Sequence, residues 1–175
     1  MLRTVKVTGR SAAYDSIRAL YMRSFPANER GSMMKLVSDS SGYSEVIAFY
    51  EDETFCGFVC LLTCRGITHI IYFAVDETLR GKGYGSEILA HIRKTKPQNR
   101  IIADIEAEND AAANNEQRCR RKRFYIKNGF KVSGVAYGWR RESYEIMICG
   151  GELSANEFKD FWKHVGSTNK NFSKF

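Results

Sequence analysis

The segment from Phe73 to Leu89 constrains the fold of this chain more than any other part of the sequence. It joins a β-rich apolar run, Ile67–Val75, to a helical pattern, Gly83–Thr95, through a short loop that contains three alternating glycines. A strand that leads directly into a helix is the repeating unit of α/β domains. The sequence therefore predicts an α/β fold.

Strands and helices alternate in the middle of the chain, whereas strands follow one another as hairpins towards both ends. The expected strands are Arg3–Val7, Glu45–Tyr50, Thr54–Thr63, Ile67–Val75, Arg100–Glu106, Phe130–Tyr137 and Arg140–Cys149, with a closing turn at Gly138. The expected helices are Ser11–Ser24, Met33–Ser38, Gly83–Thr95, Glu116–Asn128 and Ser154–His164. Because hairpins pair strands antiparallel, this order predicts a mixed sheet rather than a wholly parallel one.

A chain of 175 residues is long enough for one domain with its own hydrophobic core. We expect this domain to span residues 1–166, followed by a polar tail at residues 167–175. The longest mostly apolar run, Thr54–Cys64, is about half of the roughly 20 residues that a membrane span needs. The basic N-terminus lacks the apolar core of a secretion signal, so we expect a cytoplasmic protein without a membrane partner.

The cysteines and histidines argue against a disulfide scaffold and against a metal site. The chain has five cysteines without a CxxC pair, and its three histidines lie far apart in sequence. Cys56, Cys60 and Cys64 recur every four residues among aromatic and branched residues, which favours a strand. We therefore interpret these three cysteines as small buried apolar residues, and we predict no metal ligand.

The loop from Arg80 to Gly85, here called the glycine loop, has the composition of an anion site. Its glycines let the backbone approach a ligand closely, because no Cβ intervenes. The free amides at the start of the next helix, with the charges of Arg80 and Lys82, suit a pyrophosphate. The glycine spacing excludes the Rossmann fingerprint, and the Gly-Lys-Ser/Thr ending of a P-loop is missing. A plain strand-to-helix turn is the alternative.

Two motifs together resemble those of the GNAT superfamily of N-acetyltransferases. The first is Arg80-x-x-Gly83-x-Gly85 after a strand, and the second is Phe124–Phe130, FYIKNGF, at a helix end. They occur in the family's order, and nearly the whole order of elements agrees with it. The resemblance implies a mixed, mostly antiparallel sheet flanked by helices, in which the central parallel strands Ile67–Val75 and Arg100–Glu106 splay apart.

The resemblance also implies acetyl-CoA as cosubstrate. The pyrophosphate would sit on the amides of the glycine loop, and the pantetheine arm would pair with the strand before it. The implied cofactor contacts are Phe73, Ala74, Val75, Arg80, Gly81, Lys82, Gly83, Tyr84, Gly85 and Ser86. A backbone N–H near Val75 would face the thioester oxygen and stabilise the oxyanion. Arg118 stands where the family usually has asparagine, and from there it could reach a phosphate.

Two residues carry the implied catalytic roles. Tyr125 matches the family tyrosine that protonates the leaving thiolate, a transfer that is uphill by about 2 kcal/mol from ordinary pKa values. The alternative is a core aromatic beside Phe124. Asp104, Glu106 and Glu108 alternate along the expected strand and so share one face, where they could accept the amine proton. We assign the base to Glu106, and a solvated outer face is the alternative.

The function that the resemblance implies is acetyl transfer from acetyl-CoA to a primary amine, by direct attack in a ternary complex. The alternative is a catalytically weak module that binds acyl-CoA or nucleic acid. Specificity for the acceptor would lie in the early helices and in the closing hairpin. In the early segment, Phe25-Pro26 and Glu29-Arg30 suggest a subgroup, and Glu29 could line the acceptor side. A homodimer is left open.

A basic run, Arg118–Arg123, contributes to a net charge of +7. Such a charge fits a polyanionic partner without selecting one. On a helix the run spreads around most of the circumference, so we interpret it first as a solvated face. Support for the phosphates of the cofactor is the second interpretation. Nucleic-acid contact is the third and is not favoured, because no nucleic-acid-binding motif accompanies the run.

Overall fold

The computed structural model describes residues 2–27, 29–39, 41–139 and 141–168. Its elements are β1 (Arg3–Lys6), α1 (Ala12–Ser24), α2 (Met33–Val37), β2 (Ser44–Glu51), β3 (Thr54–Cys64), β4 (Ile67–Val75), η1 (Glu77–Leu79), α3 (Tyr84–Thr95), β5 (Arg100–Glu106), α4 (Asn115–Lys127), β6 (Lys131–Trp139), β7 (Glu142–Cys149) and α5 (Ala155–Thr168). The strand order is β1-β2-β3-β4-β5-β7-β6. Helix α3 is the crossover between the neighbours β4 and β5, which makes this pair parallel in a mostly antiparallel sheet. The predicted mixed α/β fold is confirmed.

The described residues group into two compact units. The first lies within Met1–Thr63 and Ile70–Pro97, and the second lies within Cys64–His69 and Gln98–Phe175. One domain over residues 1–166 stays a prediction. Of the expected polar tail, residues 167 and 168 form the end of α5, and residues 169–175 lie outside the described residues.

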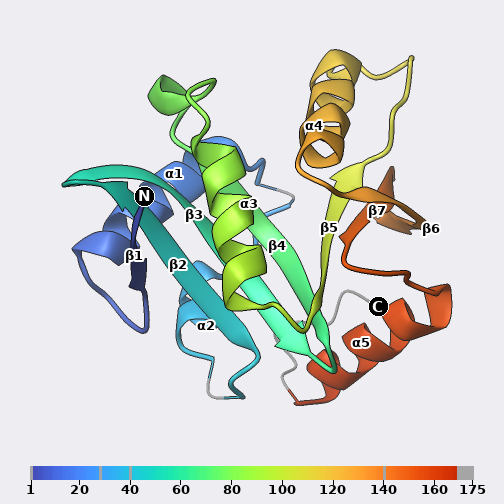
Figure 1. Cartoon of the computed structure of the whole chain (residues 1–175), viewed down its shortest axis with the longest axis horizontal. Coiled ribbons are helices and arrows are strands. Elements are labelled where there is room, and N and C mark those ends of the chain that lie inside the picture. The colour runs from blue at the N-terminus through green and yellow to red at the C-terminus, as the bar shows by residue number, and fades with distance from the viewer. Residues whose placement is uncertain (1, 28, 40, 140, 169–175) are drawn as a thin grey trace. The chain divides into compact units, whose positions relative to one another are not determined.

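In the first unit, helices cover both faces of the strands β2, β3 and β4 (Figure 1). Phe58 of β3 lies opposite Ala48 of β2, so the next residue, Phe49, points to the other face. The ring of Phe49 packs edge-on against His91 of α3, with centroids 5.4 Å apart. The ring of Phe58 packs against Tyr21 of α1, with centroids 6.3 Å apart. Helices α1 and α3 therefore lie on opposite faces of this part of the sheet.

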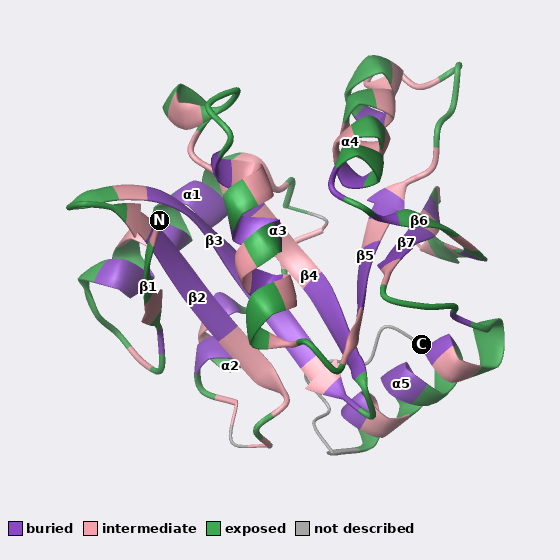
Figure 2. Cartoon of the chain, in the orientation of Figure 1, coloured by how far each residue is buried: buried purple, intermediate pink, exposed green. Residues whose placement is uncertain are grey.

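The strands β2 and β3 form the buried centre of the first unit. Figure 2 shows β3 buried along most of its length and β2 buried in its middle. The side chains of Cys56 and Cys60 are buried there, and that of Cys64, the last residue of β3, is buried as well but belongs to the second unit. All five cysteines are free thiols. Burial raises the pKa of each of these three thiols. Their predicted role as small apolar residues of a strand is confirmed.

In the second unit, β7 lies between β5 and β6 and is antiparallel to both. A buried polar network crosses this sheet. The Nε2 atom of His69 lies 2.8 Å from Asp104 Oδ1, and the hydroxyl of Tyr137 donates to Asp104 Oδ2. Three aromatic side chains of α5 pack edge-on against the His69 ring. Within the second unit, the network therefore ties α5 to His69 and to the strands β5 and β6.

Serine side chains begin two of the predicted helices. The Ser11 hydroxyl accepts a 3.2 Å hydrogen bond from the amide of Tyr14. Ser154 and Glu157 form a reciprocal capping box, in which each side chain accepts from the other's amide at 3.2 and 2.9 Å. The Ser154 amide and then the Arg100 guanidinium lower the pKa of Glu157 to about 2.

Two details differ from the sequence prediction. The closing turn expected at Gly138 is wrong, because β6 continues through Gly138 to Trp139 and β7 begins at Glu142. Arg141, directly before β7, has a φ of 70°, and residue 140 is outside the described residues. The short turn η1 was not expected before the glycine loop.

Among the described residues, no helix has the length and apolar character to cross a membrane.

Gly57 of β3 is required by the close approach of β4. A Cβ atom added at Gly57 would lie 2.4 Å from the carbonyl oxygen of Ala74 and 3.1 Å from the Cα of Val75. Both neighbours are backbone, so the clash cannot be relieved by a side-chain rotation. Gly57 thus sets the position of the end of β4, from which the glycine loop begins.

Replacing Gly57 with alanine should lower the free energy of unfolding by about 1–3 kcal/mol, the usual cost of overpacking. Urea denaturation measures this change. The matched control is Gly9→Ala, because a Cβ at Gly9 would meet no atom within 4 Å. Equal denaturation midpoints for the two variants would contradict this explanation.

Candidate functional site

The glycine loop has a backbone conformation that requires glycine at two positions. The φ angle is 79° at Gly81 and 93° at Gly83, both in the left-handed region. An added Cβ would meet no atom within 4 Å at either position, so the space beside both glycines is open. Gly83 is the N-cap of α3, and no side chain caps this helix start. Within the described part of the chain, no side chain therefore competes with an anion for the first amides of α3.

This open loop contains two cations. Arg80 and Lys82 are both exposed, and neither forms an ion pair with a residue that the structure describes. Positive charge and uncapped amides thus occur together in one short segment. This combination favours binding of a phosphate group, and it is more than a plain strand-to-helix turn requires.

The start of the loop is fixed by Asp76, which the sequence analysis did not single out. Its Oδ1 accepts from the amide of Thr78 at 3.0 Å and from the Thr78 hydroxyl at 2.7 Å, and its Oδ2 accepts from Arg23 at 3.2 Å. The bonds from Thr78 hold the pKa of Asp76 below its ordinary value. An aspartate two residues before a threonine is a recognisable turn signal, so Val-Asp-Glu-Thr could have revealed this cap.

Strand β4 uses one of its edges to pair with β3. The amide of Asp76 donates to the carbonyl of Cys56 at 2.9 Å, and the carbonyl of Ala74 faces β3 at Gly57. Successive amides of a strand point to alternate edges, so the amides of Phe73 and Val75 point away from β3. These are the amides that the family resemblance assigns to the pantetheine arm and the oxyanion.

The second motif, Phe124–Phe130, forms the C-terminal cap of α4. The amide of Phe130 donates to the carbonyl of Tyr125 at 3.1 Å, and the amide of Gly129 donates to the carbonyl of Ile126 at 3.0 Å. Gly129 has a φ of 83°, as the left-handed residue of a Schellman cap requires. The spacing of Tyr125, Gly129 and Phe130 in the motif therefore follows from the backbone hydrogen bonds of the cap. The cap places Tyr125 in the last turn of α4, three positions before the cap residue Asn128.

Tyr125 is almost completely buried between two aromatic rings. Its ring centroid lies 5.4 Å from that of Phe124 and 5.1 Å from that of Phe130. Burial raises the pKa of the Tyr125 hydroxyl, and the nearby charge of Asp104 adds to this effect while Arg121 opposes it. The hydroxyl is therefore protonated at neutral pH, as a proton donor must be. Its packing also fits the alternative of a core aromatic.

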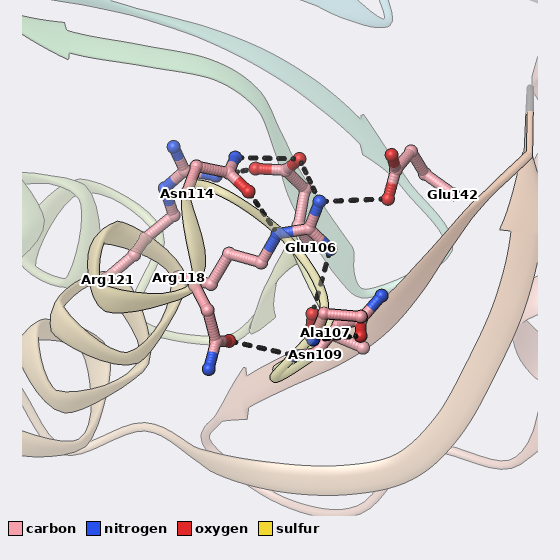
Figure 3. Close-up of polar contacts among 9 residues, drawn as sticks. Glu106, Ala107, Asn109, Asn114, Arg118, Arg121 and Glu142 are labelled. Carbon is pink, nitrogen blue, oxygen red and sulfur yellow. Dashed lines mark hydrogen bonds and ion pairs between the residues drawn. The ribbon is translucent and has the colours of Figure 1, made fainter.

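Arg118 is buried, with 4% of its side chain exposed, and all three of its guanidinium nitrogens have partners within the second unit. Its Nε donates to Asn114 at 2.8 Å and its Nη1 to the carbonyl of Ala107 at 3.1 Å. Its Nη2 lies 2.9 Å from Glu142 and 3.2 Å from Glu106 (Figure 3). The phosphate contact suggested for Arg118 stays a prediction, and these partners give the side chain a different role.

Glu106, the predicted base, is held by groups of α4 and of the loop before it. Its Oε1 contacts Arg118 and, at 3.5 Å, the amide group of Asn114, and its Oε2 pairs with Arg121 at 3.1 Å. Its side chain is only 12% exposed, and that of Asp104 is 8% exposed. The alternative of a solvated acidic face is therefore wrong for these two residues.

The predicted acidic row is shorter than expected. Strand β5 ends at Glu106, so Glu108 lies beyond the strand and is not part of its face. Its carboxylate pairs instead with Lys122 of α4 at 3.6 Å. The row therefore consists of Asp104 and Glu106 within β5.

The basic run on α4 is largely neutralised within the second unit. Arg118 and Arg121 share a helix face and contact Glu106, and Lys122 pairs with Glu145 of β7 at 3.0 Å. The interpretation of the run as a solvated face is therefore incomplete, since strand acids hold three of its cations. This internal use gives no support to nucleic-acid contact.

The segment expected on the acceptor side is held by a tyrosine of β4. The hydroxyl of Tyr72 donates to the carbonyl of Glu29 at 3.0 Å and accepts from the amide of Gly31 at 3.1 Å. The same Gly31 amide donates to the Tyr21 hydroxyl at 2.8 Å. Two tyrosines thus fix the backbone next to the Phe25-Pro26 motif.

The predicted site residues fall into two groups. Phe73–Val75 and Arg80–Ser86 belong to the first unit, where they form one continuous strand and loop. Tyr125, Glu106 and Arg118 belong to the second unit, where Glu106 and Arg118 are in direct contact. The sequence did not predict the partners of Glu106 and Arg118, which are Arg121, Glu142 and Asn114. The helical i, i+3 spacing of Arg118 and Arg121 was the available signal.

Comparisons with known proteins agree with both motifs. The family described as "Acetyltransferase (GNAT) domain" matches residues 42–132. A Bacteroides thetaiotaomicron structure assigned to the GNAT acetyltransferases is 22% identical, with a TM-score of 0.76 over 98% of this chain and 99% of that one. The Escherichia coli ribosomal-protein-S18-alanine N-acetyltransferase is 15% identical, with a TM-score of 0.62 over 87% and 97%. An Elizabethkingia anophelis GNAT acetyltransferase with acetyl-CoA bound is 16% identical, with a TM-score of 0.58 over 87% and 98%. No curated protein sequence matches the chain.

Replacing Arg118 with alanine should lower the free energy of unfolding by about 3 kcal/mol, because it leaves buried carboxylate and carbonyl groups without their partner. The matched control is Arg120→Ala, which removes an exposed arginine paired with Glu116 on the same helix and should cost under about 0.5 kcal/mol. Urea denaturation of both variants tests this. Similar losses would show that the Arg118 contacts do not hold α4.

Proposed function

The chain belongs to the GNAT family of acetyltransferases, and from this premise we propose that it transfers an acetyl group from acetyl-CoA to a primary amine. The observation that carries the proposal is the glycine loop. It combines left-handed glycines, an uncapped helix start and two cations without ion-pair partners among the described residues. A pyrophosphate has the charge and size for such a loop. A family structure with acetyl-CoA bound supports the choice of donor.

In the proposed reaction, the amine nitrogen attacks the carbonyl carbon of the thioester, so an N–C bond forms and the C–S bond breaks. The amide of Val75, which points away from β3, is the proposed donor to the developing oxyanion. A preorganised donor of this kind is worth roughly 3 kcal/mol. The acetyl group passes directly to the amine, without an intermediate on the enzyme.

Two protons must move during the transfer. The amine loses one, and Glu106 is the proposed acceptor, directly or through water. Its Oε1 contacts both Arg118 and Asn114, whereas its Oε2 contacts Arg121 alone among the described residues, so Oε2 keeps a lone pair for the proton. The coenzyme thiolate gains a proton, and Tyr125 is the proposed donor. Burial raises the pKa of Tyr125, which makes complete transfer of its proton to the thiolate less favourable. A hydrogen bond from the Tyr125 hydroxyl to the thiolate is therefore the larger contribution to catalysis.

Binding of coenzyme A is the first test of this proposal. Isothermal titration calorimetry should detect CoA binding to the wild-type chain, and Lys82→Ala should weaken it by about ten-fold, with a smaller dependence on salt. The matched control is Lys94→Ala, which removes the same charge from the other end of α3. An absence of heat with the wild-type chain would overturn the proposal.

The role of Tyr125 is tested by turnover. Tyr125→Phe should slow the release of free CoA by about ten- to a hundred-fold at saturating acetyl-CoA, in an assay over a panel of primary amines. Tyr50→Phe serves as the control, since Tyr50 is in the other unit and has no assigned role. An unchanged rate in Tyr125→Phe rules out the acid role. CoA binding without turnover on any amine would instead favour the acyl-CoA-binding module.

A further inference from the structure

The helix end of the glycine loop carries a side-chain pair that none of the assigned roles explains. Tyr84 is the first residue of α3, and its side chain is turned inward with 8% of the residue exposed. Its hydroxyl donates to Oε2 of Glu51, the last residue of β2. This bond to Glu51 is the main reason that the pKa of Tyr84 is raised to about 12. Both residues lie in the first unit.

We propose that Glu51 and Tyr84 form a clamp that positions the glycine loop for the pyrophosphate of coenzyme A. The inference rests on the proposed function, because it concerns the same loop. Tyr84 contributes its backbone at the start of α3, and its side chain connects that backbone to the sheet. Glu51 is a positioning residue that acts only through Tyr84.

The loop needs such a clamp because little else restrains it. Arg80, Gly81, Lys82 and Gly83 are all exposed, and the two glycines have no side chain to pack. A glycine gives up more conformational freedom than any other residue when it is fixed. If the loop became ordered only on binding, the free-energy cost of that ordering would weaken the binding of the ligand.

The two ends of the loop are then held by separate side-chain contacts. Asp76 caps the turn η1 before the loop and is bonded to Thr78 and Arg23. Tyr84 holds the first turn of α3 through Glu51. The exposed residues between these two points carry the open amides. In this arrangement the backbone proposed to face the ligand has no side-chain partner among the described residues, while its two ends are held.

Because Glu51 is negatively charged, the effect of the clamp on CoA affinity can be distinguished from the effect of the charge alone. A carboxylate near an anion site repels the anion, so its removal should strengthen binding if charge alone mattered. Loss of the clamp should weaken binding. The sign of the change in affinity therefore distinguishes the two effects.

The experiment is calorimetry with CoA on four variants. Glu51→Ala and Tyr84→Phe should each weaken binding by about five-fold, equivalent to about 1 kcal/mol. The double variant should be no weaker than either single one within about two-fold, because both remove the same bond. Glu51→Gln loses the charge but keeps an oxygen that accepts from Tyr84, so its affinity should lie near that of the wild type.

The matched control is Glu53→Ala. It removes the same charge from the turn after β2, where the Glu53 side chain is 98% exposed, and it leaves Tyr84 untouched. Its CoA affinity should equal that of the wild type. In the absence of ligand, hydrogen exchange at residues 80–86 should be faster in Glu51→Ala than in Glu53→Ala.

The outcomes separate this inference from the proposed function. If CoA titration of the wild-type chain gives heat and Glu51→Ala binds CoA equally tightly or more tightly, the clamp is wrong and the proposed function is unaffected. Equal affinities for Glu51→Ala and Glu51→Gln also overturn the clamp, because the hydrogen bond would then have no effect. Unchanged hydrogen exchange does the same. No heat with the wild-type chain overturns the proposed function, and the inference with it.

Discussion

A buried guanidinium holds helix α4 to the strands of the second unit. The only buried residues of this helix are Arg118 and Tyr125, so it has no apolar stripe to pack against a sheet. Arg118 bridges Glu106 of β5 and Glu142 of β7 and also bonds the carbonyl of Ala107. Burial of these charges is costly, and it is tolerated because every nitrogen of the guanidinium has an acceptor. The position of Tyr125 on α4 therefore depends on an ionic contact.

The two family motifs have a common physical basis, although they belong to different units. Each contains glycine where the backbone turns left-handed, at Gly81 and Gly83 in the loop before α3 and at Gly129 in the cap after α4. The first turn leaves helix amides open, and the second satisfies helix carbonyls. A residue with a Cβ would strain either turn. The motifs are thus patterns of backbone conformation, and they also hold the groups to which the proposed function assigns coenzyme binding and proton donation.

The sequence predicted the elements well wherever local signals were strong. The predicted starts of α1 and α5, the predicted end of α4 at Asn128 and the predicted bounds of β5 agree with the structure. It failed at Gly138, because a glycine signals a turn locally and only strand pairing showed that β6 runs through it. The sequence also could not predict the ion pairs of the basic run, because the acids that neutralise it come from β5, β7 and the segment after β5.

By itself, the sequence determined the α/β order of elements, the glycine loop and the helix cap, and so the family. These features depend on residues close together in the chain, because caps, left-handed turns and side-chain periodicity act over a few residues. Only the tertiary structure decided three features. Position 57 must be glycine because the backbone of β4 approaches it closely, Arg118 pairs with acids of its own unit, and Glu51 accepts a hydrogen bond from Tyr84. Each of these contacts joins residues from separate elements, and the sequence pattern of neither partner encodes the distance between them.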